Sequence, residues 1–317
     1  MGSPSGIGGL LINIDTEIYR HSIAHPPQFS PKPYKNFRVE PLTGALGAEV
    51  LGLNIPAQLT DESVAAELRI ALHQHLVLMF RNQAINREQL RKIGQWFGDL
   101  QINQSVKKHE SDDVMLVRQE ADEPYNFAGN WHSDVTWDAR PSGETALYAI
   151  EVPPCGGDTH FANTALAFET LPHELRQNLI NLTAMHELSR SQREFALKKK
   201  ADAELGSEAA MEKFAEHPVI RTHPITGRRS LFINEQFTTR FTDMSEEESR
   251  PLLSSLMRHQ IRPDFTCRIR WKKGTLAVWD NRSTIHYASN DYPNLRRLMM
   301  RVSTVGEVPI RPQVSNS

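Results

Sequence analysis

The sequence predicts a mainly β fold with flanking helices, and among such folds a jelly roll fits best. Many short apolar stretches with strand character run through the 317 residues, and glycines and prolines mark the turns between them. Only a few amphipathic helices interrupt this pattern. The ends of distant strands meet at one mouth of a jelly roll, which would bring an early His-x-Asp pair close to a late histidine.

The chain is expected to hold one folded domain preceded by an arm. Residues 1–36 are irregular in pattern and rich in proline, which is typical of an extended segment. Residues 37–317 show no internal repeat and no linker that would divide them. We therefore expect a single jelly-roll domain at 37–317 that carries the functional site, with a helical, charged insertion at about 165–217.

Strands and helices are expected to alternate before the insertion. Apolar residues every three or four positions indicate helices, and continuous or alternating apolar runs indicate strands. The predicted elements are two strands within 37–55, a helix capped by Thr60 or Asp61, a strand at 76–80, a helix capped by Asn86, and strands at 114–118 and 145–150.

Strands return after the insertion. They are predicted at 219–223, 230–234, 266–271, 275–279 and 298–305, with one helix at 245–262. The most charged part of the insertion, 190–216, is interpreted first as a solvated helix. Its place in the chain also makes it a candidate lid over the site, and an oligomer contact is the alternative.

Composition limits the classes of partner. The formal net charge of −2 gives no electrostatic footprint for nucleic acid or for an anionic membrane surface. No apolar run approaches 18 residues, so no membrane span is expected. Cys155 and Cys267 lie far apart, which excludes a disulfide framework or a thiolate zinc site and favours the reducing cytoplasm.

A His-x-Asp pair within Trp131–Trp137 is the first candidate for chemistry. On an extended strand, His132 and Asp134 would point to the same face. An imidazole and a carboxylate that converge in this way supply two of the three ligands of a 2-His-1-carboxylate Fe(II) site. His-x-Asp is common by chance, however, and a surface pair is the alternative. The candidate third ligand is His286.

Two arginines follow His286 in the sequence. Arg297 and Arg301 are four residues apart, so both would face the same side of an extended strand. Two guanidinium groups on an apolar strand are costly to bury without anions. They can pair bidentately with a carboxylate or a sulfonate, and structural salt bridges are the alternative.

The chain resembles the taurine dioxygenase family of Fe(II)/2-oxoglutarate-dependent oxygenases, which includes alkylsulfatases and aryloxyalkanoate dioxygenases. The resemblance covers roughly residues 37–309. It depends on the order and spacing of five motifs, "WHSDVTW", "GGDTHFANTALAFETLP", "HPITGRRSLFIN", "WDNRSTIHYASNDY" and "RRLMMR". The family fold is a double-stranded β-helix, the jelly roll.

The resemblance implies a role for each matching residue. His132, Asp134 and His286 would be the iron ligands, and Thr159 and Arg297 would hold the distal carboxylate of 2-oxoglutarate. Arg301 would contact the anionic group of the prime substrate or help to anchor the cosubstrate. Val135 would line the substrate pocket.

The sequence departs from the taurine-specific pattern at three positions. Asn103 and Val106 stand where those members carry a histidine and a tyrosine, and Ala128 stands where they carry an asparagine. Asn103 would therefore belong to the substrate pocket. The loss of these polar contacts argues against taurine and favours a larger, more apolar anion.

The implied activity is that of a dioxygenase with Fe(II) as cofactor and 2-oxoglutarate and O₂ as cosubstrates. It would hydroxylate, and could oxidatively cleave, a small organic anion such as an alkyl sulfate, a sulfonate or an aryloxyalkanoate. A homodimer or homotetramer is usual in the family. Two alternatives stay open: a Zn²⁺-dependent, cupin-like hydrolase or isomerase, and a non-catalytic binder of small molecules on the same fold.

Overall fold

The computed structural model describes residues 34–102, 113–122, 129–188 and 214–313. Several sequence predictions lie outside these ranges: the arm at 1–33, the substrate-pocket positions Asn103, Val106 and Ala128, and most of the charged stretch 190–216. The last residues of the predicted arm are described, and they pack against the domain. Tyr34 stacks on Phe37 with ring centroids 4.8 Å apart.

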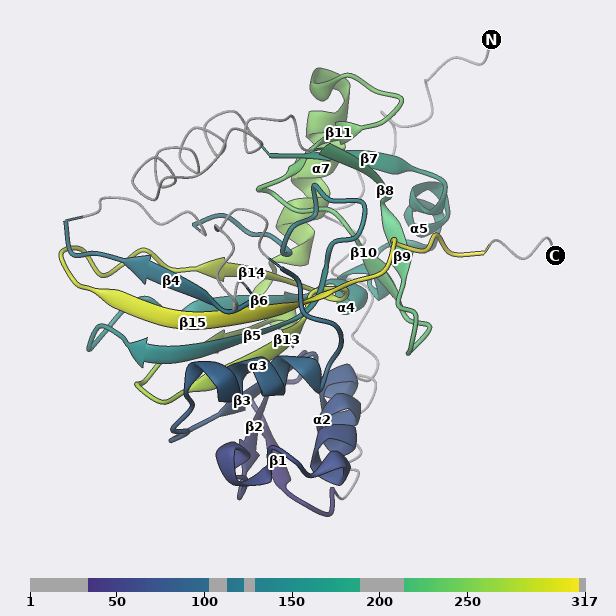
Figure 1. Ribbon diagram of the computed structural model, residues 1–317. Coiled ribbons are helices and arrows are strands. Elements are labelled where there is room, and N and C mark those ends of the chain that lie inside the picture. Colours follow the sequence, from purple (N-terminus) through teal and green to yellow (C-terminus); the bar gives the residue numbers. More distant parts are fainter. Residues whose placement is uncertain (1–33, 103–112, 123–128, 189–213, 314–317) are drawn as a thin grey trace, which may run out of the picture.

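A seven-stranded sheet forms the larger layer of the fold (Figure 1). Its order is β1 (Arg38–Pro41), β2 (Ala48–Leu51), β3 (Val77–Phe80), β13 (Leu276–Asp280), β5 (Ser142–Glu151), β15 (Arg297–Val305) and β4 (Met115–Gln119). Neighbours are antiparallel except β2 and β3. Strands from the two ends of the chain thus lie side by side, as a jelly roll requires.

A three-stranded sheet forms the opposite layer, in the order β12 (Thr266–Ile269), β6 (Thr159–Asn163) and β14 (Thr284–Ala288). Apolar side chains from both layers pack together between them: Met79, Leu147, Phe161, Ile269, Trp279 and Met299. Burial of this shared interior, at roughly 25 cal/mol per Å² of apolar surface, holds the two layers together.

Two smaller sheets extend the structure beyond this sandwich. One has the order β11 (Thr238–Phe241), β7 (Thr183–Glu187), β8 (Phe214–Pro218), and the other pairs β9 (Ile220–Thr222) with β10 (Arg229–Leu231). The short helices α4 (Thr164–Glu169) and α5 (His173–Ile180) and the longer α7 (Glu246–Gln260) pack with these sheets around a second apolar cluster. Ser245 and Glu248 form a capping box at the start of α7.

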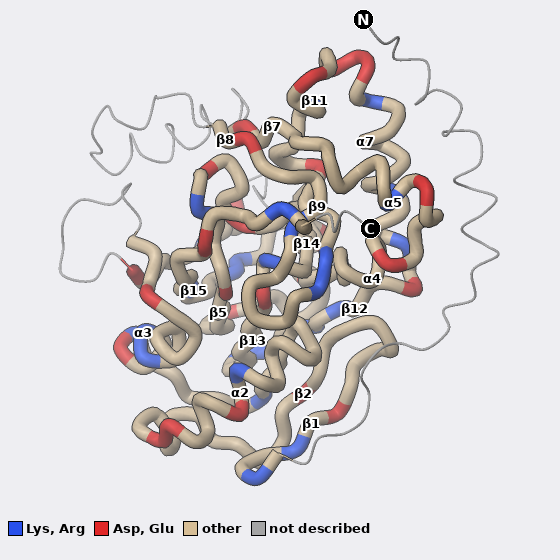
Figure 2. Tube along the Cα trace, turned by 90° about the vertical axis from the view of Figure 1, so that its right-hand side faces the viewer, with Lys and Arg blue, Asp and Glu red and all other residues tan. Residues whose placement is uncertain are grey.

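Two helices cover the outer face of the seven-stranded sheet, below it in Figure 1. In α2 (Glu62–His75) the Asp61 side chain accepts hydrogen bonds from the first backbone amides, so Asp61 and not Thr60 is the cap. In α3 (Arg87–Gln95) Asn86 and Gln89 form a capping box. Single-turn 3₁₀ helices at Ile55–Gln58 and Pro263–Phe265 complete the described elements. Acidic and basic residues are interspersed along the described part of the trace (Figure 2).

Part of the predicted insertion lies within the described residues. There, helix is found in α4 and α5, and the flanks of the charged stretch are the strands β7 and β8, which pair antiparallel. The buried positions of these two strands include His186 and His217. Because histidine is polar, the sequence did not show the alternation of apolar and polar residues that predicts a half-buried strand. The strands β11 and β14 were also missed by the sequence analysis.

Candidate active site

Three predicted ligands meet at one end of the sandwich. A single antiparallel bridge joins His132 to His286 on the free edge of β14, with N···O distances of 2.9 and 2.7 Å. The Nε2 atoms of His132 and His286 lie 3.9 and 3.7 Å from Oδ1 of Asp134. These separations are too long for hydrogen bonds but suit three atoms that share one cation. All three side chains are buried.

The backbone around Asp134 corrects the sequence prediction. Only His132 takes part in a strand-like bridge, and the chain then turns instead of continuing as an extended strand. Val135 adopts a φ of 57°, which is strained for a β-branched residue. The imidazole of His217 holds the turn by donating from Nε2 to the carbonyl of Thr136 at 2.9 Å. This turn brings the Asp134 carboxylate next to both imidazoles.

The protonation states of the three residues fit a divalent metal. Nδ1 of His132 lies 2.8 Å from the carbonyl oxygen of Asn130, so Nδ1 carries the proton and Nε2 keeps its lone pair. Burial lowers the pKa of both His132 and His286, which keeps the imidazoles neutral. Burial alone would raise the pKa of Asp134, but the positive charge of Arg301, helped by the hydrogen bond from Thr145, outweighs burial and holds that pKa well below its usual range. Neutral imidazoles and an ionised carboxylate are the forms that bind metal.

The two arginines of β15 face the interior of the sandwich, as the spacing predicted. Met299, midway between them, is fully buried between the two layers. Arg301 reaches the ligand set, with Nη2 2.9 Å from Oδ1 of Asp134. Arg297 lies deeper, with only 5% of its surface exposed. Arg301 therefore lies directly against the candidate metal ligands, and Arg297 lies on the same face of β15.

Arg297 is a buried cation that lacks a counterion within the described ranges. Its Nε has no hydrogen-bond partner there, and its guanidinium carbon lies 5.8 Å from the ring centroid of Trp271. Burial lowers its pKa, with weaker opposition from Tyr292 and Asp158. Trp271 donates from Nε1 to the hydroxyl oxygen of Thr159 at 2.9 Å, and so links the two residues predicted to hold a carboxylate. An uncompensated guanidinium of this kind is suited to an incoming anion.

Comparison with known proteins decides the family. Residues 38–303 match the family model described as "Taurine catabolism dioxygenase TauD, TfdA family". The chain belongs to this family.

Members of the family and of its fold resemble the chain over most of its length. The alkylsulfatase of Acinetobacter baylyi is 33% identical over 289 residues, which cover 88% of both chains. The alpha-ketoglutarate-dependent sulfate ester dioxygenase of Pseudomonas putida is 33% identical over 279 residues, 86% of this chain and 90% of the other.

Solved structures lead to the same conclusion about the fold. A taurine dioxygenase from Burkholderia xenovorans superposes with a TM-score of 0.73 at 32% identity, covering 87% of this chain and 93% of that one. AAD-2 in complex with Mn(II) and N-oxalylglycine superposes with a TM-score of 0.70 at 28% identity, covering 86% and 98%. The predicted jelly roll and the predicted reaction class are confirmed: the chain is an Fe(II)- and 2-oxoglutarate-dependent dioxygenase.

A second cluster with the composition of a metal site has a different explanation in this dioxygenase. His73, His223 and Asp280 also bring ligand-type atoms within 4.8 Å of one another. Nδ1 of His223 accepts two backbone hydrogen bonds, from Ile225 and Thr226, each at 3.1 Å. Its Nε2 therefore carries the proton and donates it to Oδ2 of Asp280 at 2.7 Å. A hydrogen bond, and not a cation, joins this pair.

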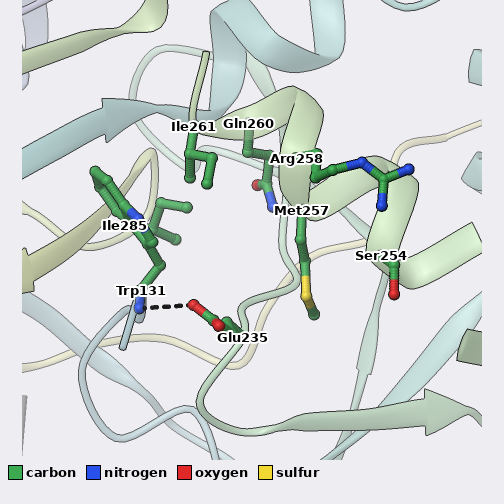
Figure 3. A pocket seen from close by; sticks show the side chains of 8 residues that line it. All are labelled: Trp131, Glu235, Ser254, Met257, Arg258, Gln260, Ile261 and Ile285. Atoms are coloured by element: carbon green, nitrogen blue, oxygen red, sulfur yellow. Dashed lines mark hydrogen bonds between the residues drawn. The ribbon is translucent and has the colours of Figure 1, made fainter. Parts of the chain in front are cut away.

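A cavity of about 270 Å³ lies behind the ligand bridge (Figure 3). Trp131 and Ile285, which line it, precede His132 and His286 in sequence and so point away from the ligand side of the extended backbone. Its other walls include Glu235, Met257, Gln260 and Ile261. The cavity is thus separated from the candidate metal ligands by the bridge itself.

Sequence analysis missed several residues that shape the site. Trp271 and the tryptophan of β13, Trp279, pack beside Arg297 and His286 respectively, and the Trp279 ring lies 5.0 Å from that of His286. Phe237 contacts His132 edge-on, with centroids 5.9 Å apart. Their sequence signal is only that of buried aromatic residues, which is common in any core.

Proposed function

We propose that His132, Asp134 and His286 hold the Fe(II) of this dioxygenase. Thr159 and Arg297 receive the distal carboxylate of 2-oxoglutarate, and Arg301 binds the anionic group of the prime substrate. The observation that carries the proposal is the buried guanidinium of Arg297, whose Nε has no hydrogen-bond partner among the described residues, together with a buried 2-His-1-carboxylate set. A carboxylate on Arg297 would offset the cost of burying that charge.

The residues of the chain contribute binding and orientation to the reaction. Bound Fe(II), with 2-oxoglutarate and O₂, supplies the oxidising chemistry that converts 2-oxoglutarate to succinate and CO₂ and inserts oxygen into a substrate C–H bond. Arg297 fixes the cosubstrate at its far end, Arg301 fixes the anion of the substrate, and Val135 lines the substrate pocket. Asn130 keeps the proton of His132 on Nδ1, away from the metal side.

We infer that the prime substrate is a sulfate ester or a sulfonate with an apolar body. The relatives named as an alkylsulfatase and as a sulfate ester dioxygenase support this class. Asn103, Val106 and Ala128 stand where taurine-specific members have a histidine, a tyrosine and an asparagine, and the loss of these polar contacts favours a more apolar anion than taurine. Hydroxylation of the carbon that bears the ester oxygen gives an unstable product, which breaks down to an aldehyde and sulfate.

One titration separates this function from its rivals. Anaerobic protein with Fe(II) and 2-oxoglutarate should develop a charge-transfer band that alkyl sulfates perturb, and air should then yield succinate. Arg297→Met should lose the band at the same 2-oxoglutarate concentration. A Zn²⁺-dependent hydrolase would be supported by turnover without 2-oxoglutarate, and a non-catalytic binder by ligand binding without succinate.

Location, assembly and domain organisation extend the proposal. None of the helices in the described ranges is long and apolar enough to cross a membrane. Cys155 and Cys267 are both free thiols, which supports a reducing cytoplasm. We propose a cytoplasmic homodimer or homotetramer built from a single domain at 37–317, and sedimentation velocity tests the assembly.

Limited proteolysis with and without substrate tests 190–216 as a lid, because a lid should become protected.

A further inference from the structure

The two oxygens of Asp134 face different surroundings. Oδ1 points toward the two imidazoles and Arg301, at 3.9, 3.7 and 2.9 Å. Oδ2 accepts a hydrogen bond of 2.8 Å from the hydroxyl of Thr145 on β5. Thr145 has no exposed surface, so this contact is shielded from water. Oδ1 thus faces the candidate metal position, with Arg301 beside it, and Oδ2 is occupied by Thr145.

The hydrogen bonds of Thr145 fix the direction of its hydroxyl. A carboxylate oxygen can only accept, so the Thr145 hydrogen must point to Asp134. The Nδ2 of Asn281 donates to the Thr145 oxygen at 3.0 Å. The Ser303 hydroxyl lies 3.0 Å from the same oxygen and must donate to it, because the only hydrogen of Thr145 is already committed.

Asn281 is held in one orientation. Its Oδ1 accepts from Nε1 of Trp279 at 3.0 Å and from the backbone amide of Asp134 at 3.2 Å. A flipped amide would place two donors against those donors, so Nδ2 must face Thr145. Asn281 therefore holds the backbone of Asp134 directly and its side chain through Thr145.

The same chain of donors begins at Arg301. Its Nε donates to Ser303 at 3.3 Å, Ser303 donates to Thr145, and Thr145 donates to Oδ2 of Asp134. Arg301 thus touches Oδ1 directly and reaches Oδ2 through two hydroxyl groups. Hydrogen bonds hold both the backbone amide and the Oδ2 atom of Asp134. The carboxylate therefore cannot rotate to offer both oxygens to a metal.

We propose that Thr145 and Asn281 are positioning residues that keep Asp134 a one-oxygen ligand, and that Ser303 couples them to the anion-binding Arg301. This inference rests on the proposed metal site and names neither residue as a ligand. It predicts that the hydroxyl of Thr145, and not its bulk, controls how the carboxylate binds metal.

Anaerobic titration with Co(II), followed by ligand-field absorption, tests the inference without turnover. Thr145→Val keeps the shape and removes the hydroxyl, and it should weaken Co(II) affinity about 10- to 100-fold and alter the spectrum. Thr145→Ser keeps the hydroxyl and should bind as the parent protein does. Thr275→Val is the matched control, because Thr275 is as buried as Thr145. Thr275 directly precedes β13, at the end of that strand away from Thr145, and its hydroxyl accepts a hydrogen bond from Arg81.

The outcomes separate the inference from the proposed function. Parent-like Co(II) binding by Thr145→Val, or equal loss in Thr145→Ser or Thr275→Val, would overturn the positioning role. Parent-like binding by Asp134→Ala would instead overturn the metal site itself. A folding defect is recognised from the melting temperature of each metal-free variant, and Thr145→Ser keeps the inference testable in that case. A raised KM for the anionic substrate in Ser303→Ala, with the Co(II) spectrum intact, would support the coupling to Arg301, and an unchanged KM would contradict it.

Discussion

Two clusters of this protein have the same composition but differ in where the proton of one histidine lies. Each brings two histidines and one aspartate within reach of one another. In the cluster of His223 and Asp280 the facing atoms are 2.7 Å apart and share a proton. In the cluster of His132 and Asp134 they are 3.9 Å apart, and the proton of His132 is held on the far nitrogen. The position of the proton, and not the residue types, distinguishes a ligand set from a structural pair.

The arginines next to the two clusters differ in the same way. Arg282 is surrounded by carboxylates, with Glu144 at 2.7 Å, Glu307 at 2.9 Å and Asp280 at 3.2 Å. Burial would lower its pKa, but these three anions outweigh burial and raise it. For Arg297 burial prevails and the pKa falls. Carboxylates of the protein neutralise the charge of Arg282, whereas the guanidinium of Arg297 is available to a ligand.

The largest expected effect is the loss of metal binding when the carboxylate of Asp134 is removed. Asp134→Ala should lose Fe(II) or Co(II) binding by more than about 100-fold, since loss of an outer-shell partner alone costs 10- to 100-fold. His223→Gln should still bind one equivalent, because the glutamine amide can continue to donate to Asp280. Metal content by mass spectrometry of native protein measures both variants. Two equivalents in the parent and one in His223→Gln would mean that the structural pair is also a metal site.

The next largest effect is on the free energy of unfolding, and it should differ between variants of Arg282 and Arg297. Arg282→Met should lower the free energy of unfolding by about 3–5 kcal/mol, because it leaves Asp280 and Glu144 buried without a cation. Arg297→Met removes a cation without a described counterion, so the metal-free protein should be as stable as the parent or more stable. Urea unfolding of both variants, without metal or 2-oxoglutarate, makes the measurement. Comparable destabilisation by both would show that Arg297 has a structural partner after all.

Local sequence patterns were enough to name the candidate site residues, but they did not predict how the backbone places them. His132, Asp134, His286 and the arginine pair could be named because their spacing and motifs are specific. The turn at Val135 could not be foreseen, since a strained φ of 57° is imposed by contacts from β8 that are distant in sequence. The sequence indicated an extended strand there, and tertiary packing overrode it.

The fold was predictable in its class and in most strands of the large sheet. Strands β7 and β8 were not, because buried histidines at their inward positions mimic a polar surface. Thr145 and Asn281 were also not singled out, although they hold the carboxylate and the backbone of Asp134. A hydroxyl or an amide has no spacing rule, so only its partners in space reveal its role.

A smaller effect tests which anion the arginine pair serves. Arg301→Gln should raise the KM for an alkyl sulfate about 10- to 100-fold, since a charged partner is lost at a partly exposed site. The affinity for 2-oxoglutarate should change much less, because Arg297 remains. Steady-state kinetics with each substrate varied in turn separate the two. A KM that rises for 2-oxoglutarate alone would assign Arg301 to the cosubstrate, and Lys in place of Arg301 should recover only part of the loss.

The smallest effect uses a buried imidazole, His259, which contacts no carboxylate among the described residues. His259 donates from Nε2 to the carbonyl of Ala167 at 2.8 Å, and burial lowers its pKa to about 4. The folded-state pKa lies below the unfolded value of about 6.5, so the unfolded chain binds more protons as the pH falls between these values. Acidification from pH 7 to pH 5 should therefore cost about 1–2 kcal/mol at this residue. His259→Gln can still donate to Ala167 and should flatten that slope in urea unfolding, whereas the exposed His173→Gln should leave it unchanged. An identical slope in all three proteins would mean that His259 takes up its proton at the same pH in the folded and unfolded chains, and would contradict the lowered pKa.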